Sequence, residues 1–294
     1  MVDEVCQVPR VPRPGEGVVA LSRERRLGGC AFNSANAIRQ LGGAYALFAP
    51  VGTGSAAAFV RAELSARGMA GVEVGGARDN GSCLCMIEPD GERTMLTFQG
   101  IDRFFEPAWF EGLDTRPFGI ALASGYEIEG AGGAAIVSFL EAHPEIAYFH
   151  APGPCITRID SALTARINAL HPVWHVNDAE ARAYAGCERL EDAGRAIAAQ
   201  TGGVVVVTAG AAGAYAFGAE GADAIGMLHV PTAPTDPLDT TGAGDAHLGA
   251  LAFARARGMG WKDALALANR VAGAVCRVQG ATLSDEEFSA LVRL

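Results

Sequence analysis

The most informative stretch of this chain is Asp239-Thr240-Thr241-Gly242-Ala243-Gly244-Asp245-Ala246. A proline-rich segment precedes it, and an apolar run that ends at Ala256 follows it, which predicts a helix that begins where the stretch ends. The free N–H groups at a helix start attract negative charge, and glycines allow several of these groups to converge on one anion. The stretch therefore predicts an anion-binding loop that leads into a helix.

Asp245 does not suit a loop that merely stores an anion, because a carboxylate repels a phosphate. It does suit a site in which Asp245 accepts the proton of a hydroxyl. The backbone N–H groups of Gly242, Ala243 and Gly244 would then hold the charge of a phosphoryl group in transfer. The alternative is an aspartate that only caps a buried helix.

The composition is that of a globular protein: of 294 residues, 50% are apolar and 19% are charged. A net charge of −10 disfavours a nucleic-acid partner. No stretch approaches the roughly 20 apolar residues that cross a bilayer. The seven cysteines form no CxxC pair, so we expect reduced thiols, no zinc site, no membrane association and a cytoplasmic location.

Strands and helices alternate from Ile120 onward. The most regular strand is Val204–Thr208, a β-branched run typical of a strand buried on both faces. This alternation predicts an α/β fold with a parallel sheet and right-handed crossovers. The other strands are expected at 120–123, 146–149 and 173–176, with helices at 130–142 and 159–169.

The first hundred residues have a different pattern. Proline and glycine interrupt residues 1–27, which predicts edge strands and turns, including a strand at Val18–Leu21. Residues 82–98 alternate around Pro89-Asp90-Gly91, which predicts a β-hairpin. An apolar run predicts a further strand over Ala44–Val51.

Gly52-Thr53-Gly54 follows that last run and raises the alternative of an NAD-dependent oxidoreductase. A dinucleotide loop needs a third glycine, and position 57 is alanine. It also needs an acid at the end of the next strand, and Glu73 lies in a glycine-rich context instead. The pattern therefore disfavours this alternative.

The uninterrupted match over Asp239–Asp245 resembles the C-terminal signature of the PfkB, or ribokinase-like, family of carbohydrate and nucleoside kinases. The resemblance implies one domain over 1–294, a three-layer α/β/α sandwich with a mainly parallel central sheet and a small β-sheet lid. The lid strands would come from about 5–27 and 82–100. It also implies an ATP-dependent kinase with Asp245 as catalytic base and the 242–245 backbone as anion hole.

The same resemblance extends to residues that would bind the acceptor substrate. Gly28, Gly29 and Asn33 match the N-terminal signature and would touch substrate hydroxyls together with Asp245. Asp3 has the spacing of an aspartate that binds sugar hydroxyls just after the first strand of the family. Only Met1 and Val2 precede it here, so either the first strand is missing or one strand of the core sheet is built differently.

The resemblance places a nucleotide site on other segments. Asn177 and Glu180 match an Asn-x-x-Glu motif that would hold Mg²⁺ through water, although alone they read as a capping box. The remaining nucleotide-binding residues implied by the family are Thr208, Gly210 and Gly213, which follow a strand, and Asn269 on the adenine side.

Asp239 and the turn 280–284 resemble loops that hold K⁺ in some family members. The family likeness also implies a homodimer formed through the lid and a small-molecule substrate. A nucleoside kinase and a catalytically silent sugar- or nucleotide-binding protein remain as alternatives to a sugar kinase.

Overall fold

The computed structural model describes residues 1–76, 78–218 and 226–292, which form two compact units. Unit 1 consists of Met1–Phe32 and Leu47–Phe105, and unit 2 consists of Asn33–Ala46 and Glu106–Leu294. The chain passes from unit 1 to unit 2 within helix α1 (Cys30–Gln40).

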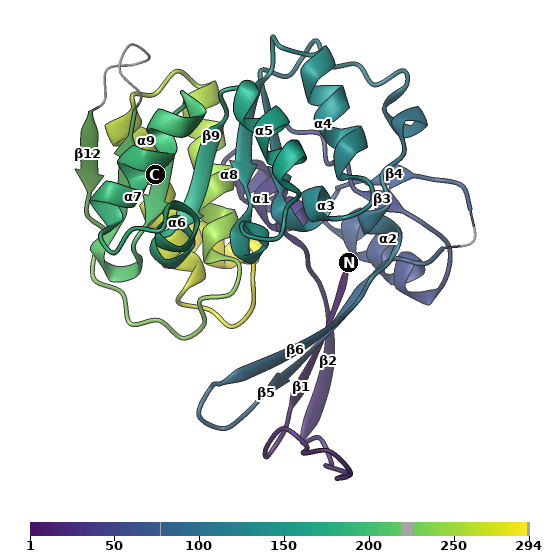
Figure 1. Cartoon of the computed structure of the whole chain (residues 1–294). Coiled ribbons are helices and arrows are strands. Elements are labelled where there is room, and N and C mark those ends of the chain that lie inside the picture. The colour runs from purple at the N-terminus through teal and green to yellow at the C-terminus, as the bar shows by residue number, and fades with distance from the viewer. Residues whose placement is uncertain (77, 219–225, 293–294) are drawn as a thin grey trace. The chain divides into compact units, whose positions relative to one another are not determined.

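Unit 1 is built around a four-stranded sheet in the order β2-β1-β5-β6 (Figure 1). Strand β1 (Val2–Gln7) pairs antiparallel with β2 (Ser22–Leu27) and parallel with β5 (Ser82–Ile87). Strands β5 and β6 (Arg93–Phe98) form the expected antiparallel hairpin. Its turn contains Gly91 at φ 88°, a left-handed conformation that glycine adopts without strain.

Three strand predictions in this unit need correction. Val18–Leu21 is not a strand, and the chain pairs only from Ser22, where charged residues suit the sheet edge. The run Ala44–Val51 forms only the short β3 (Pro50–Val51), which pairs with β4 (Val72–Glu73). A first strand is present and begins at Val2, but it lies in the four-stranded sheet, and Asp3 lies within it rather than after it.

Unit 2 contains a six-stranded sheet in the order β12-β11-β10-β9-β8-β7. Strands β7 to β10 run parallel, as the alternating pattern predicted, and β11 and β12 add an antiparallel edge. The strands are β7 (Ile120–Ser124), β8 (Ala147–Ala151), β9 (Val173–Asn177), β10 (Val205–Thr208), β11 (Ala214–Phe217) and β12 (Met227–Val230).

The helix expected over 130–142 begins only at Gly133, because a turn with glycines at 130 and 132 precedes it, and a separate short helix occupies 125–129. The helices are α2 (Ser55–Ala66) in unit 1, and α3 (Gly125–Glu129), α4 (Gly133–Ala142), α5 (Ser161–Ala169), α6 (Asp178–Ala185), α7 (Leu190–Thr201), α8 (Ala243–Ala256), α9 (Trp261–Val275) and α10 (Asp285–Leu291) in unit 2. Short 3₁₀ turns lie at Ile101–Arg103, Pro107–Phe110, Gly153–Cys155 and Gly210–Ala212.

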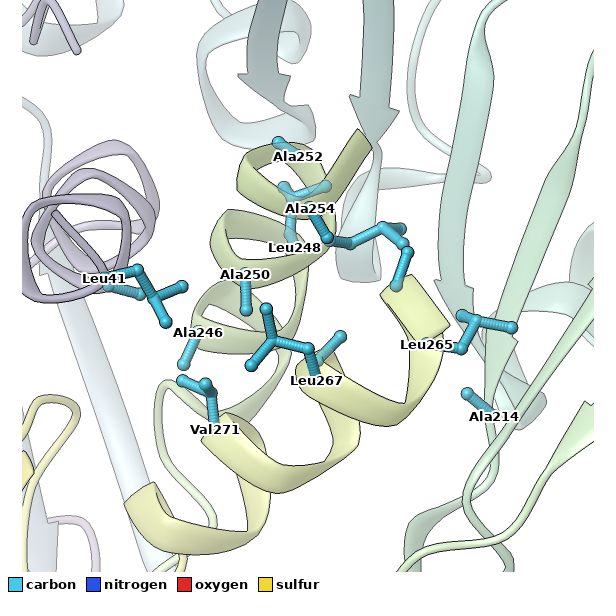
Figure 2. Close-up of a cluster of buried hydrophobic side chains, with 14 of the residues drawn as sticks. Leu41, Ala214, Ala246, Leu248, Ala250, Ala252, Ala254, Leu265, Leu267 and Val271 are labelled. Carbon is cyan, nitrogen blue, oxygen red and sulfur yellow. The ribbon is translucent and has the colours of Figure 1, made fainter. Parts of the chain in front are cut away.

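Strand β10 shows how the three layers of unit 2 arise. Its side chains alternate between the two faces of the sheet, as in any strand. Val206 belongs to the apolar cluster formed with α8 and α9, part of which Figure 2 shows. Val205 and Val207 pack on the opposite face with residues of α6 and α7, including Ile197. Both faces are therefore covered, which gives the α/β/α sandwich expected from the sequence.

Strand register fixes one edge of this sheet. Asn177, the last residue of β9, lies beside Thr208, the last residue of β10. The carboxyl ends of parallel strands meet at one edge, and ligands of open α/β sheets bind there. The two segments implicated in nucleotide binding are thus neighbours.

Candidate active site

Helix α8 begins at Ala243, three residues before the start that its apolar run predicts, so Gly244 and Asp245 lie in its first turn. Gly242 is the N-cap residue with φ 73° and ψ −5°. Ala246 N–H donates to the Gly242 carbonyl at 2.9 Å, which begins the helical hydrogen bonding. The N–H groups ahead of it lack helical partners and carry the positive end of the helix dipole, although that of Ala243 donates to the Thr240 carbonyl at 3.3 Å.

The two glycines of this stretch have different surroundings. A Cβ on Gly242 would lie 2.3 Å from the carbonyl oxygen of Ala281, so Gly242 is required both by its left-handed backbone and by a close contact. A Cβ on Gly244 would meet nothing within 4 Å. The space beside Gly244 in the first turn of α8 is therefore open.

Asp245 is held by two neighbouring residues of α1. The Asn33 amide Nδ2 donates to Asp245 Oδ2 at 2.8 Å, and the Ser34 hydroxyl donates to the Asp245 carbonyl at 2.9 Å. The helices approach closely because Gly249 of α8 has no side chain, and a Cβ there would lie 2.4 Å from the Ser34 carbonyl oxygen. Asn33 and Asp245, both predicted as site residues, are thus brought together.

The second polar atom of the Asn33 amide, Oδ1, is buried and has no hydrogen-bond partner among the described residues. Asn33 itself is only 6% exposed. A buried acceptor without a donor is costly. The substrate-binding role expected of Asn33 stays a prediction.

Asp239 joins two loops. It is 7% exposed, and its carboxylate accepts the Thr241 N–H at 2.7 Å and the Gly280 N–H at 3.0 Å. Together with the contact of Gly242 with Ala281, this clamp ties the loop before α8 to the turn after α9. The K⁺ role suggested for Asp239 stays a prediction.

Asn177 and Glu180 form a capping box at the start of α6. Asn177 Oδ1 accepts the Glu180 N–H at 2.8 Å, and Glu180 Oε2 accepts the Asn177 N–H at 3.0 Å. Burial raises the pKa of Glu180 above its ordinary value, against the opposing effect of its hydrogen bonds with Asn177. The motif therefore caps helix α6. It also places the Asn177 and Glu180 side chains at the carboxyl edge of the sheet.

The segment after β10 combines a structural glycine with an open one. A Cβ on Gly213 would lie 2.3 Å from the Val230 carbonyl oxygen, so this glycine is needed for chain packing. Gly210 has φ 54° and open space around its Cα. The Thr208 hydroxyl donates to the Val176 carbonyl at 3.4 Å, which leaves it at the strand edge beside Asn177.

Asn269, expected on the adenine side, is held by hydrogen bonds inside unit 2. It is 6% exposed, its amide donates to the Val230 carbonyl at 2.9 Å, and its Oδ1 lies 3.2 Å from His247 Nε2. Both polar atoms are thus used inside unit 2, because α9 turns this residue toward the sheet. The adenine-side role of Asn269 stays a prediction.

Within unit 1, Asp3 and Gly28 are in close contact. A Cβ on Gly28 would lie 1.9 Å from Asp3 Oδ2, so only glycine allows the carboxylate this position. The neighbouring Gly29 has φ 107°, which again favours glycine. Three of the residues assigned to the acceptor substrate therefore form one local group in this unit.

The Gly52-Thr53-Gly54 segment has a structural explanation. Asp79 occupies the start of α2, where its carboxylate accepts the Ala56 N–H at 3.1 Å and the Ala57 N–H at 2.7 Å. A Cβ on Gly54 would lie 2.2 Å from that carboxylate. The place where a dinucleotide would put its phosphates is filled by a side chain of the protein, which removes the basis for an NAD site here.

Sequence reasoning did not identify Ser34 or the buried pair His175 and His247, whose ring nitrogens lie 2.9 Å apart. The two histidines are 72 residues apart in the sequence, and no local signal connects them. Within the ranges that the structure describes, no group of three or more His, Cys, Asp or Glu side chains could hold a metal. In those same ranges, no helix is long and apolar enough to cross a membrane.

The chain resembles known proteins over most of its length. A family model described as pfkB family carbohydrate kinase matches residues 1–121 and 158–287. The chain is 31% identical over 284 residues to a protein of Escherichia coli K12 named uncharacterized sugar kinase YegV, which covers 95% of this chain and 87% of that protein.

Solved structures show the same fold at low sequence identity. A ribokinase from Thermotoga maritima matches with a TM-score of 0.80 and 19% identity, over 99% of this chain and 95% of that one. A ribokinase from Arabidopsis thaliana, solved in complex with ribose and ATP, matches with a TM-score of 0.78 and 19% identity, over 100% and 96% of the two chains.

Proposed function

The chain belongs to the PfkB family of carbohydrate kinases, which transfer a phosphoryl group to a hydroxyl, and we propose that it moves the γ-phosphoryl group of ATP to a sugar or sugar-like alcohol. The observation that carries this proposal is the hydrogen bond from Asn33 to Asp245 at the open start of α8. It joins a group that can take a proton to a group that can orient a hydroxyl.

In the proposed reaction Asp245 is the general base. Asn33 Nδ2 donates to Asp245 Oδ2 at 2.8 Å, so the amide sets the orientation of the carboxylate that would receive the proton of the acceptor hydroxyl. As this hydroxyl attacks the γ-phosphorus, its proton passes to Asp245 and the bond from the γ-phosphorus to the bridging oxygen breaks, which releases ADP.

The backbone at the start of α8 would stabilise the charge on the transferred group. N–H groups of Gly242, Ala243 and Gly244 precede the first helical hydrogen bond, and the space beside Gly244 is open. Preorganised donors of this kind lower the barrier because they need no reorganisation when charge moves. The close contact of Gly242 with Ala281 keeps this backbone in place.

The proposed nucleotide site lies at the carboxyl edge of the unit 2 sheet. Thr208 and the open backbone at Gly210 would contact phosphates. Asn177 and Glu180 supply oxygen atoms of the type that Mg²⁺ prefers. When bound, Mg²⁺ would neutralise phosphate charge.

Asp3, Gly28, Gly29 and Asn33 are proposed to bind the acceptor. A carboxylate accepts hydrogen bonds from two hydroxyls, and glycines let a substrate approach the backbone. This chemistry suits a polyhydroxylated molecule. We further propose that Asp239 helps to hold K⁺, that the chain acts in the cytoplasm, and that it forms a homodimer through the four-stranded sheet.

The experiment is an ATP-consumption screen across pentoses, hexoses, sugar acids and nucleosides, run with wild type and with Asp245→Asn. At least one acceptor should be phosphorylated, and the variant should turn over at least about a hundredfold more slowly while still binding ADP. A silent binding protein would bind a sugar or nucleotide without turnover. Near wild-type turnover of Asp245→Asn would refute the assigned base.

A further inference from the structure

Two histidines buried in unit 2 have no part in the reaction proposed above. His175 lies in the middle of β9 and is 6% exposed, and His247 lies in the second turn of α8 and is 2% exposed. His175 Nε2 is 2.9 Å from His247 Nδ1. Apolar side chains could fill this space without the cost of desolvating polar groups, so the burial of two histidines needs an explanation.

The hydrogen-bond chain continues to α9 and β12. His247 Nε2 lies 3.2 Å from Asn269 Oδ1, and Asn269 Nδ2 donates to the Val230 carbonyl. Because the Asn269 NH₂ group faces a carbonyl, its Oδ1 must accept, and His247 therefore carries its proton on Nε2. His247 Nδ1 is then an acceptor, and His175 must donate to it from Nε2. Each of these hydrogen bonds therefore has one defined donor and one defined acceptor.

The two histidines lie close in sequence to the two parts of the proposed site. His175 is two residues before Asn177, and His247 is two residues after Asp245. The pair thus connects the strand that leads into the Asn177–Glu180 motif to the helix that carries the base. Since β9 is an inner strand of the sheet, it offers a rigid reference for the first turn of α8.

The apolar contacts of α8 give less control over its position along the helix axis than its hydrogen bonds do. Its buried face contains small side chains, among them Ala246, Ala250 and Ala254. Contacts between alanines fix the separation of two helices, but they are non-directional and change little when one helix slides by a fraction of an ångström. A hydrogen bond is directional and weakens with such a shift.

We infer that His175 and His247 are positioning residues for phosphoryl transfer, whose hydrogen bond holds the first turn of α8 against β9 and so sets Asp245 relative to the Asn177–Glu180 motif. Ser34 holds the same turn from α1 through the Asp245 carbonyl. The inference rests on the proposed function, because it takes Asp245 as the base. It predicts that the link to β9 matters more for turnover than the link from His247 to Asn269.

Two variants at position 247 separate these links. In His247→Asn the side-chain oxygen can take the place of Nδ1, which keeps the acceptor for His175 and removes the donor to Asn269. In His247→Gln the longer side chain can place its amide nitrogen where Nε2 lies, which keeps the donor to Asn269 and removes the acceptor for His175. Each variant loses one buried hydrogen bond, so the two form a matched pair.

The first measurements are kcat, the KM values for ATP and for the acceptor with the highest turnover in the screen, and the melting temperature. His247→Gln should have a kcat about tenfold below that of His247→Asn, with similar KM values and similar melting temperatures. Equal kcat in the two variants, or kcat values that follow the melting temperatures, would show that the pair is merely structural.

A second measurement needs no acceptor. Hydrogen–deuterium exchange of peptides that cover 240–249 should be faster in His247→Gln than in His247→Asn, by about three- to tenfold at the first turn of α8. Equal exchange in both variants overturns the inference. If the wild type phosphorylates no acceptor, the proposed function fails, and the exchange comparison still decides whether His175 holds α8.

Discussion

Replacing Gly242 with alanine tests whether the backbone before α8 is held in the conformation that the proposed anion hole needs. Gly242 has φ 73°, where a residue with a Cβ is destabilised by about 1–2 kcal/mol. The new Cβ would also lie 2.3 Å from the Ala281 carbonyl oxygen, and overpacking of this kind costs about 1–3 kcal/mol. The two effects together predict a loss of about 2–5 kcal/mol.

With an unfolding entropy of about 2 cal/mol/K per residue, this loss corresponds to a melting temperature lower by about 3–8 °C for the whole chain. Relief of the clash would move the N–H groups of Ala243 and Gly244. Because loss of one preorganised donor lowers kcat by about a hundredfold or more, Gly242→Ala should be strongly impaired even at temperatures where it is folded. Calorimetry and a coupled ADP-release assay measure the two quantities.

Gly244→Ala is the matched control. Gly244 lies in the first turn of α8, and its Cβ would meet nothing within 4 Å, so its melting temperature should stay within about 2 °C of wild type. Turnover should nevertheless fall by at least about tenfold, because the methyl group enters the space proposed for the phosphoryl group. A Gly242→Ala protein with wild-type melting and turnover, or equal destabilisation by both variants, would refute the reasoning.

Three further predictions concern the ions and the assembly. If Asp239 and its loop help to hold K⁺, replacing K⁺ with tetramethylammonium should lower turnover, and unchanged activity would contradict that role. Chelation of Mg²⁺ with EDTA should abolish turnover, and Glu180→Gln should raise the Mg²⁺ concentration needed for half-maximal rate by about tenfold or more; an unchanged Mg²⁺ requirement would exclude Glu180. On strand β6 the side chains of Met95, Leu96 and Phe98 are 56%, 52% and 55% exposed. We therefore expect light scattering at micromolar concentration to show a dimer that Leu96→Lys disrupts. A wild-type monomer, or a dimer that Leu96→Lys does not disrupt, would contradict an interface at β6.

Much of the architecture followed from local patterns. The β-branched run at Val204–Thr208 is buried because no polar side chain interrupts it, and Asp-Gly at 90–91 forms the hairpin because this pair suits a tight turn. The wrong strand prediction at Val18–Leu21 also came from a local pattern. Its residues favour a strand, but neighbouring pairing begins at Ser22, and pairing partners are not visible in a short window.

The candidate site was also partly visible. Gly242 and Asp245 were identified from their place at a helix start, and Asn33 from the signature after the glycine pair. The contacts of Asn269 could not be foreseen, because its number along α9 does not reveal which way the helix faces. It faces inward because Val230 and His247 offer its amide both an acceptor and a donor.

The sequence by itself determined the chemistry at single positions: a helix start with glycines that favours an anion, a carboxylate in its first turn, and an Asn-x-x-Glu capping box. These properties depend on neighbours a few residues away, so they can be read from a short stretch. Three contacts depend on the tertiary structure alone. Asn33 donates a hydrogen bond to Asp245, 212 residues away in the sequence, and Gly280 donates one to Asp239, 41 residues away. His175 is hydrogen-bonded to His247, 72 residues away. Such pairs depend on how whole helices and strands pack, because a directional hydrogen bond forms only where the fold brings both groups within about 3 Å.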